Sequence, residues 1–109
     1  MNLTVKDLEE LIKKSNDNGN IYVKIIKYGK EEMFNVVNSS PNPIKLTLTI
    51  EKDSEKIMKI AELFDLINNY GDMATIELIQ TQSSIFITEI YDVNEGYLVG
   101  KDLYLLVYK

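Results

Sequence analysis

One apolar pattern that occurs twice constrains the fold more than any other feature of this sequence. Each copy has four apolar residues with helical spacing, and the copies lie 55 residues apart: Val5, Leu8, Leu11 and Ile12, then Ile60, Leu63, Leu66 and Ile67. Such spacing places the four side chains on one face of an amphipathic α-helix. Because alternating segments typical of β-strands follow both stripes, the sequence predicts a tandem duplication of a helix–strand unit.

The first copy is expected to begin with a helix at Thr4, where Thr4 and Asp7 have the spacing of a capping box. A turn-forming run over residues 15–20 is expected to end this helix. Alternation of apolar and polar residues then predicts three strands, over residues 21–28, 33–37 and 45–50.

The second copy is expected to contain a helix over residues 55–69, with Ser54 as its N-cap. Three strands are predicted to follow, over residues 74–81, 85–91 and 97–108. Residues 94–96 are predicted to form the turn between the last two strands, and Gly100 a bulge within the last one.

Together these elements predict an α+β fold: a tandem duplication of an αβββ unit, with two helices packed on an antiparallel sheet of about six strands. The chain would form a single domain, residues 1–109, built of two repeats at about 3–52 and 56–109. Within the repeats, Val23 and Ile25 match Ile76 and Leu78 at an offset of 53. Two unrelated helix–strand units are the alternative, because any such units share the same binary pattern.

Three residue types that carry much of protein chemistry are absent, because the chain contains no cysteine, no histidine and no arginine. Without cysteine there is no disulfide and no thiolate zinc site. Without histidine there is no ready general base near neutral pH, and without arginine no bidentate fork for phosphate. We therefore expect a non-enzymatic protein with no catalytic residue, no metal and no cofactor. An enzyme that uses the carboxylates of Asp92 and Glu95 is a weaker alternative, since nothing indicates that they converge.

The negative charge lies entirely in the second half of the chain. Residues 1–54 hold eight lysines and eight acids, whereas residues 55–109 hold four lysines and nine acids, which gives the net charge of −5. This sign argues against direct binding to nucleic acid. The acidic residues expected to meet a basic partner are Asp72, Glu77, Glu89, Asp92 and Glu95. A solvated surface that keeps the protein soluble is the alternative.

The two copies also differ in their apolar surface. The second helix is expected to have a wider apolar stripe, which Ile57 and Met58 extend, and which is buried in the monomer or meets a partner. The last predicted strand has Tyr104, Leu106 and Tyr108 on its outward face, where the matching strand of the first copy is polar. Aromatic and aliphatic residues on an outer sheet face predict an interface, formed with a second copy of the chain, with another protein or with the chain's own loops.

These observations predict a small acidic binding or inhibitor protein that acts by protein–protein interaction, and the chain is expected to form a homodimer. In length, acidity and helix-then-sheet order it is similar to the phage and mobile-element proteins that inhibit host defence nucleases, the anti-CRISPR type; this likeness covers no specific motif. Immunity proteins and antitoxins that neutralise a toxin fit the same features. A protein that sequesters a nucleotide or small molecule is a further alternative, with a pocket between protomers lined by Tyr22, Tyr28, Tyr91 and Tyr97. No apolar leader and no apolar run of about 20 residues is present, which favours a cytoplasmic location without membrane contact.

Overall fold

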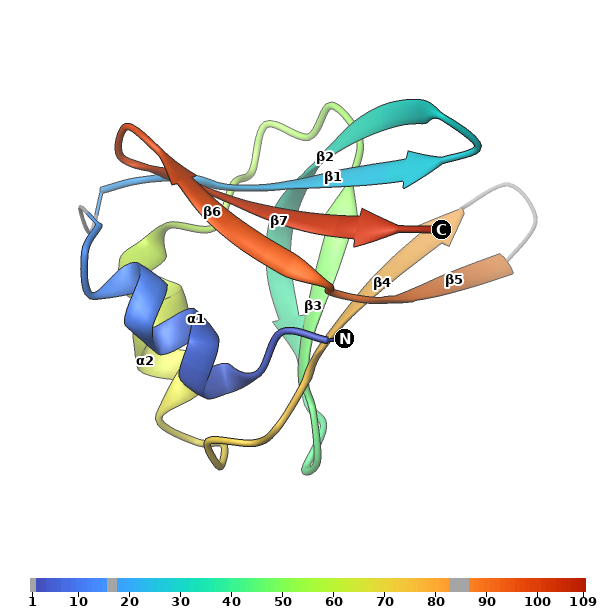
Figure 1. Cartoon of the computed structure of the whole chain (residues 1–109). Helices are drawn as coiled ribbons and strands as arrows, with labels where there is room; N and C mark the ends of the chain where they lie inside the picture. The colour runs from blue at the N-terminus through green and yellow to red at the C-terminus, as the bar shows by residue number, and fades with distance from the viewer. Residues whose placement is uncertain (1, 16–17, 83–86) are drawn as a thin grey trace.

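The protein folds as a strongly curved mixed β-sheet with two short helices at one side (Figure 1). It is described by a computed structural model, which covers residues 2–15, 18–82 and 87–109. In chain order the elements are α1 (Val5–Ile12), β1 (Ile21–Lys27), β2 (Lys30–Ser40), β3 (Leu46–Glu51), α2 (Ile60–Ile67), β4 (Ile76–Gln82), β5 (Ile87–Asp92), β6 (Glu95–Val99) and β7 (Asp102–Tyr108).

All seven strands belong to one sheet, in the order β5-β4-β3-β2-β1-β7-β6. The β3·β4 and β1·β7 pairs are parallel, and the other pairs are antiparallel. The two edge strands, β5 and β6, follow one another in the chain and are separated only by Val93 and Asn94. Because the three Cα–Cα steps from Asp92 to Glu95 span about 11 Å at most, the sheet must curl until its edges meet at this junction. The result is a half-barrel (Figure 1).

The predicted α+β fold, with two helices packed on an antiparallel sheet of six strands, is wrong. The molecule is mostly sheet, and its seventh strand arises because the predicted strand over 97–108 is broken. Gly100, with φ +59°, and Lys101 form a tight turn that pairs Val99 with Asp102. The turn predicted at 94–96 is instead the passage from β5 into β6.

The parallel pairs were also missed, because a hairpin fixes only the pairing of strands adjacent in sequence. In the structure, the first strand of each half pairs with the last strand of the other half: β1 with β7, and β4 with β3. β2 also extends through Ser40 into the predicted loop, because its end pairs with β3 after an irregularity between Val36 and Asn38. The predicted start of a strand at Ile85 lies outside the described residues.

The helix at the N-terminus begins as its sequence predicts. The backbone N–H of Asp7 donates to the Thr4 hydroxyl at 3.2 Å, and the Thr4 N–H donates to the Asp7 carboxylate at 3.1 Å. This capping box satisfies two backbone donors that a helix start leaves unpaired. These hydrogen bonds lower the pKa of the Asp7 carboxyl. Within the described residues, neither helix has the length and apolar character needed to cross a membrane.

The second helix is shorter than predicted, because α2 begins at Ile60 and ends at Ile67. Ser54 is not its cap; its hydroxyl accepts the backbone N–H of Lys56 in a turn. Met58, two residues before α2, is buried, and its N–H donates to the Val36 carbonyl at 2.7 Å. Pairing with the sheet therefore overrides the apolar periodicity that predicted a helix here, and Met58 widens no helical stripe.

Corresponding hydrogen bonds in the two halves of the chain show which residues occupy equivalent positions. Leu103 N–H donates to the Asn20 carbonyl at 2.9 Å, and Leu46 N–H donates to the Thr75 carbonyl at 3.1 Å. These bonds make residue 20 equivalent to residue 75, so the first strands of the halves match at an offset of 55 rather than the predicted 53. A common origin of the halves by duplication stays a prediction.

The core lies between the concave face of the sheet and the two helices, which sit side by side at one end of the half-barrel (Figure 1). Alternate residues of β1, Ile21, Val23 and Ile25, point inward and are buried, as the period of two requires. The helices contribute the predicted stripes to this core: Val5, Leu8 and Ile12 from α1, and Ile60, Leu63 and Ile67 from α2.

Candidate protein-binding site

Three tyrosines stand side by side on the convex face of the sheet. In the strand register, Tyr22 of β1 lies opposite Tyr104 of β7, and Tyr104 lies opposite Tyr97 of β6. The ring centroids are 5.3 Å apart for Tyr22–Tyr104 and 5.4 Å apart for Tyr97–Tyr104. The planes of the second pair differ by only 11°, so these rings stack face to face. We call Tyr22, Tyr104 and Tyr97 the tyrosine ladder.

A lysine is held against this ladder. Lys24 Nζ lies 5.2 Å from the ring centroid of Tyr104 and 5.7 Å from that of Tyr97, within the range of cation–π attraction. The same ammonium forms an ion pair with Glu31 at 3.5 Å. A hydrogen bond with Tyr97, and then the charge of Glu31, raise the pKa of Lys24 above its ordinary value. Ring stacking and the contact with Lys24 therefore hold the three rings in one arrangement in the free protein.

Leu106 and Tyr108, two of the three predicted interface residues of the last strand, lie next to the ladder, but only Tyr108 is exposed. Leu106 faces outward between Lys24 and Glu95 in the register, but it is only 9% exposed, so its neighbours cover it. Tyr108 is 51% exposed, and its hydroxyl donates to the Glu95 carboxylate at 3.3 Å. Partial burial and the Glu95 charge raise the pKa of Tyr108. Tyr104 and Tyr108 can thus contact a partner directly, whereas Leu106 supports them.

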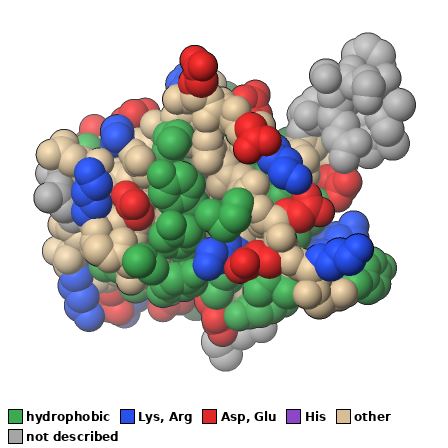
Figure 2. Space-filling view, turned by 90° about the horizontal axis from the view of Figure 1, so that it is seen from above, with side chains coloured by type: hydrophobic (Ala, Val, Ile, Leu, Met, Phe, Trp, Pro, Cys, Tyr) green, Lys and Arg blue, Asp and Glu red, His purple; other side chains and the backbone are tan. Residues whose placement is uncertain are grey.

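Seen from above, side chains of the hydrophobic class, in which tyrosine is counted, form a band on this face of the molecule (Figure 2). Lysine and acidic side chains lie on either side of the band. Of the residues just named, the ladder and Tyr108 belong to the apolar class drawn in this view, while Lys24, Glu31 and Glu95 are charged. The face therefore has an aromatic centre and a charged margin, the composition that protein interfaces share.

The other half of the sheet, formed by β2, β3 and β4, shows that the fold does not need tyrosines at these positions. There β4 pairs with β3 as β1 pairs with β7, and β3 pairs with β2 as β7 pairs with β6. The residues in the three matching positions are Glu77, Thr47 and Ser40, since Glu77 lies opposite Thr47 and Thr47 opposite Ser40. The same backbone arrangement is therefore stable with polar residues, and the ladder is a feature of one half only.

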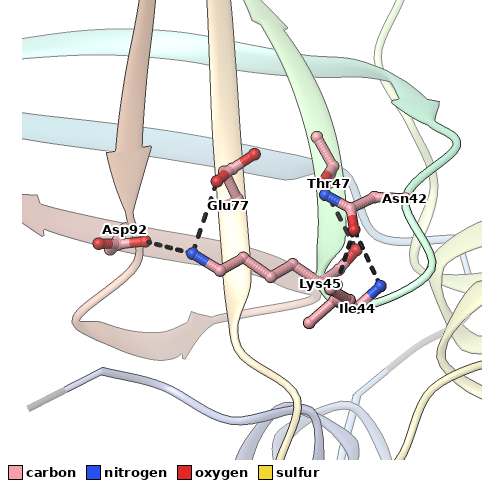
Figure 3. Close-up of polar contacts among 6 residues, drawn as sticks. All are labelled: Asn42, Ile44, Lys45, Thr47, Glu77 and Asp92. Carbon is pink, nitrogen blue, oxygen red and sulfur yellow. Dashed lines mark hydrogen bonds and ion pairs between the residues drawn. The ribbon is translucent and has the colours of Figure 1, made fainter.

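On that polar side, Lys45 joins two of the predicted acidic residues (Figure 3). Its Nζ lies 3.6 Å from a Glu77 oxygen and 3.8 Å from an Asp92 oxygen, reaching across β4 toward β5. Asn42 holds the start of β3, because its side-chain oxygen accepts the backbone N–H of Lys45 at 3.1 Å. Lys45 thus neutralises a pair of carboxylates that lie directly opposite one another in the register.

The structure does not bring the five predicted acidic residues together. Glu77 and Asp92 lie on the polar side, where Lys45 pairs with both. Asp72 lies in the loop after α2, and Glu89 accepts a hydrogen bond from the buried Tyr91 hydroxyl. Only Glu95 adjoins the ladder, through Tyr108. Charge alone could not reveal this, because strand position decides which face each acid occupies.

Within one molecule, the four tyrosines expected to line a pocket between protomers do not lie together. Tyr28 is 88% exposed in the turn after β1, whereas Tyr91 is buried against the core on the concave side. Burial, followed by the hydrogen bond to Glu89, raises the pKa of Tyr91 strongly. Only Tyr22 and Tyr97 of the predicted four belong to one cluster, and Tyr104 lies between them.

Sequence reasoning missed Tyr22, Lys24 and Tyr97 as members of the interface, although it selected Tyr104. Their outward position followed from strand alternation, but their neighbourhood depends on the β1·β7 and β6·β7 pairs. In the described residues, no group of three or more potential metal ligands occurs. The chain matches no protein-family model, no curated protein and no solved structure.

Proposed function

We propose that this chain is a non-enzymatic binding protein that docks the tyrosine ladder and Tyr108 onto another protein. The observation that supports this most directly is the contrast between the two halves of the sheet. Three matching positions hold tyrosines on one side and Glu77, Thr47 and Ser40 on the other. Since the fold accommodates polar residues there, a requirement other than stability accounts for the tyrosines.

The stacked rings favour a protein partner over a nucleobase. A base that stacks on an aromatic residue needs a free ring face. In the ladder, Tyr97 and Tyr104 stack at 5.4 Å, Tyr22 lies tilted against Tyr104 at 5.3 Å, and Lys24 lies against the rings of Tyr97 and Tyr104. What remains outward are ring edges and hydroxyl groups, which suit the mixed apolar and hydrogen-bonding contacts that tyrosines make at protein interfaces.

The charges around the ladder indicate what kind of protein surface fits it. Glu31, Glu95 and Asp102 lie along its margin, and Lys24 is already paired with Glu31. With a net charge of −5 on the whole chain, the complementary surface is basic. Basic surfaces line the nucleic-acid channels of nucleases, so a role as a cytoplasmic inhibitor of a host defence nuclease is consistent with this proposal. Neutralisation of a toxin with a basic surface would use the same contacts.

The experiment transplants the polar residues of one half onto the other. A double variant, Tyr97→Ser with Tyr104→Thr, places at the ladder the residue types that the matching positions already hold. The immobilised wild type and variant are compared for proteins captured from host lysate, and each captured protein is then purified and tested with both. We expect a partner with a basic surface that binds the wild type at least about tenfold more tightly, which is the scale of one interface hot spot.

The matched control is Thr49→Ala, an outward position of β3 on the polar side. This variant should bind the partner as the wild type does. Circular dichroism and thermal melting must show that all three proteins are folded. Equal binding by the double variant would contradict the proposal. Light scattering tests whether a second copy of the chain binds this face instead. If the wild type is a dimer and the double variant is a monomer, a second copy covers the face. The proposal of a different partner is then wrong.

A further inference from the structure

The outer edge of β6 offers backbone groups to a further strand. Within the described residues β6 pairs with β7 alone, and α1 and the N-terminal segment run below it (Figure 1). The N-terminal segment begins beside this edge, where the Leu3 N–H donates to the Val93 carbonyl at 2.9 Å, and the chain then continues into α1. Edges of native sheets are usually guarded by lysine, proline or a covering element. From Gly96 to Val99, β6 has no charged residue and no proline.

A groove runs between this edge and α1. One hollow of about 420 Å³ is lined by Asn2, Leu3, Asp7, Asn94, Glu95 and Tyr108. A second, of about 290 Å³, shares Leu3 and Asp7 and continues along α1 to Glu10, Leu11, Lys14 and Gly96. Volumes of this order are those of pockets that bind ligands, roughly 300–1,000 Å³. The groove therefore has room for side chains of an added strand, and Leu3 and Leu11 are the aliphatic residues of its lining.

The charge of the groove identifies its occupant. Its walls carry three carboxylates, Asp7, Glu10 and Glu95, against the single ammonium of Lys14. An aliphatic stem with a cationic end fits this arrangement, because the stem can cover apolar side chains while the charge reaches a carboxylate. A second copy of this chain fits it less well, since each copy carries a net charge of −5.

We propose that this groove binds an extended, lysine-bearing peptide segment of another protein, which adds to the sheet as a strand beside β6. Its backbone hydrogen bonds with the free edge of β6, as in other cases of strand addition. Alternate side chains of the peptide point into the groove, where their stems lie over Leu3 and Leu11 and their ammonium groups approach Glu10 and Asp7. This site shares Tyr108 and Glu95 with the surface proposed above, but it is argued from the edge of β6 and the groove and does not rest on that proposal.

The test uses a defined probe, the peptide acetyl-Lys-Val-Lys-Val-Lys-Val-Lys-amide, with the full chain. Binding is followed by ¹H–¹⁵N NMR titration and calorimetry. We expect the amide signals of β6 to shift. The variant Glu10→Lys should weaken binding by about fivefold, the effect of a partly exposed charge contact. The matched control is Asp65→Lys, at the equivalent exposed position of α2, which should change the affinity by less than about twofold.

Two altered peptides separate strand addition from general attraction to an acidic protein. A peptide with an N-methyl group at every residue has no backbone N–H to donate along either of its edges, and we expect it not to bind. A peptide with glutamate in place of lysine should fail as well. The proposal is overturned if the lysine peptide leaves the β6 signals unchanged, if the N-methylated peptide binds as tightly as the parent, or if Asp65→Lys weakens binding as much as Glu10→Lys.

Discussion

Gly19 is the position where the smallest substitution should do the most damage. It is buried at the point where the chain enters β1, next to the β6–β7 turn and the start of α2. A Cβ added there would lie 1.7 Å from the Lys101 carbonyl oxygen and 2.8 Å from the Ile60 side chain. Ordinary carbon–oxygen contacts are about 3.3 Å or longer, so Gly19→Ala must push the two backbones apart by roughly 1.6 Å.

That displacement strains two neighbouring hydrogen bonds. The Gly19 carbonyl accepts the Ile60 N–H at 2.9 Å, and the Asn20 carbonyl accepts the Leu103 N–H at 2.9 Å. Overpacking costs about 1–3 kcal/mol, and each lost hydrogen bond about 1 kcal/mol. We expect Gly19→Ala to lower the free energy of unfolding by about 2–5 kcal/mol. For a domain of this size the melting temperature should then fall by at least about 10 °C.

Urea unfolding followed by circular dichroism measures this effect, and a second glycine provides the control. A Cβ at Gly71 would meet no atom within 4 Å, and the φ angle there is not positive. Gly71→Ala should therefore leave stability unchanged or raise it by about 0.5 kcal/mol. If Gly19→Ala unfolds at the same urea concentration as Gly71→Ala, the close approach of β1, the β6–β7 turn and α2 is not present in solution.

Three further predictions concern single side chains. Leu63→Ala should lower the free energy of unfolding by about 2–5 kcal/mol, because the leucine is fully buried, whereas Phe64→Ala, 38% exposed, should cost clearly less in the same urea experiment. Lys45→Met should destabilise by less than about 1 kcal/mol, and the loss should shrink in 1 M salt, because it leaves two facing carboxylates unneutralised; a loss independent of salt would contradict this reason. Since the pKa of Tyr91 is raised in the folded state, its contribution to stability is present below about pH 10 and falls as the pH rises further; Tyr91→Phe should flatten that fall in urea midpoints measured between pH 8 and 11, and an unchanged slope would count against the raised pKa.

Local pattern was sufficient for several parts of the fold. The apolar stripes of α1 and α2 and the capping box at Thr4 were predicted correctly, because their determinants lie within four residues of each other. Strand alternation also placed Tyr104 and Tyr108 outward. The start of α2 was wrong because Met58 pairs with Val36 far away in sequence, and no local pattern contains that bond.

The candidate site was predictable only in part. Tyr104 was chosen because it is an aromatic residue on an outward strand position. Tyr22 and Tyr97 could not be joined to it, since their neighbourhood depends on a parallel pair between the first and last strands of the two halves. Even Leu106, selected for its apolar character, is covered by neighbours that only the strand register identifies.

By itself the sequence determined what each residue can do: which faces of its helices are apolar, which strand positions alternate, and which chemistry is excluded without cysteine, histidine and arginine. Only the tertiary structure decided which residues act together. Propensity and periodicity act over a few residues, whereas the pairing of β1 with β7 joins segments about 80 residues apart through hydrogen bonds and burial. That pairing places the β6–β7 hairpin beside β1 and so assembles three separate tyrosines into one surface.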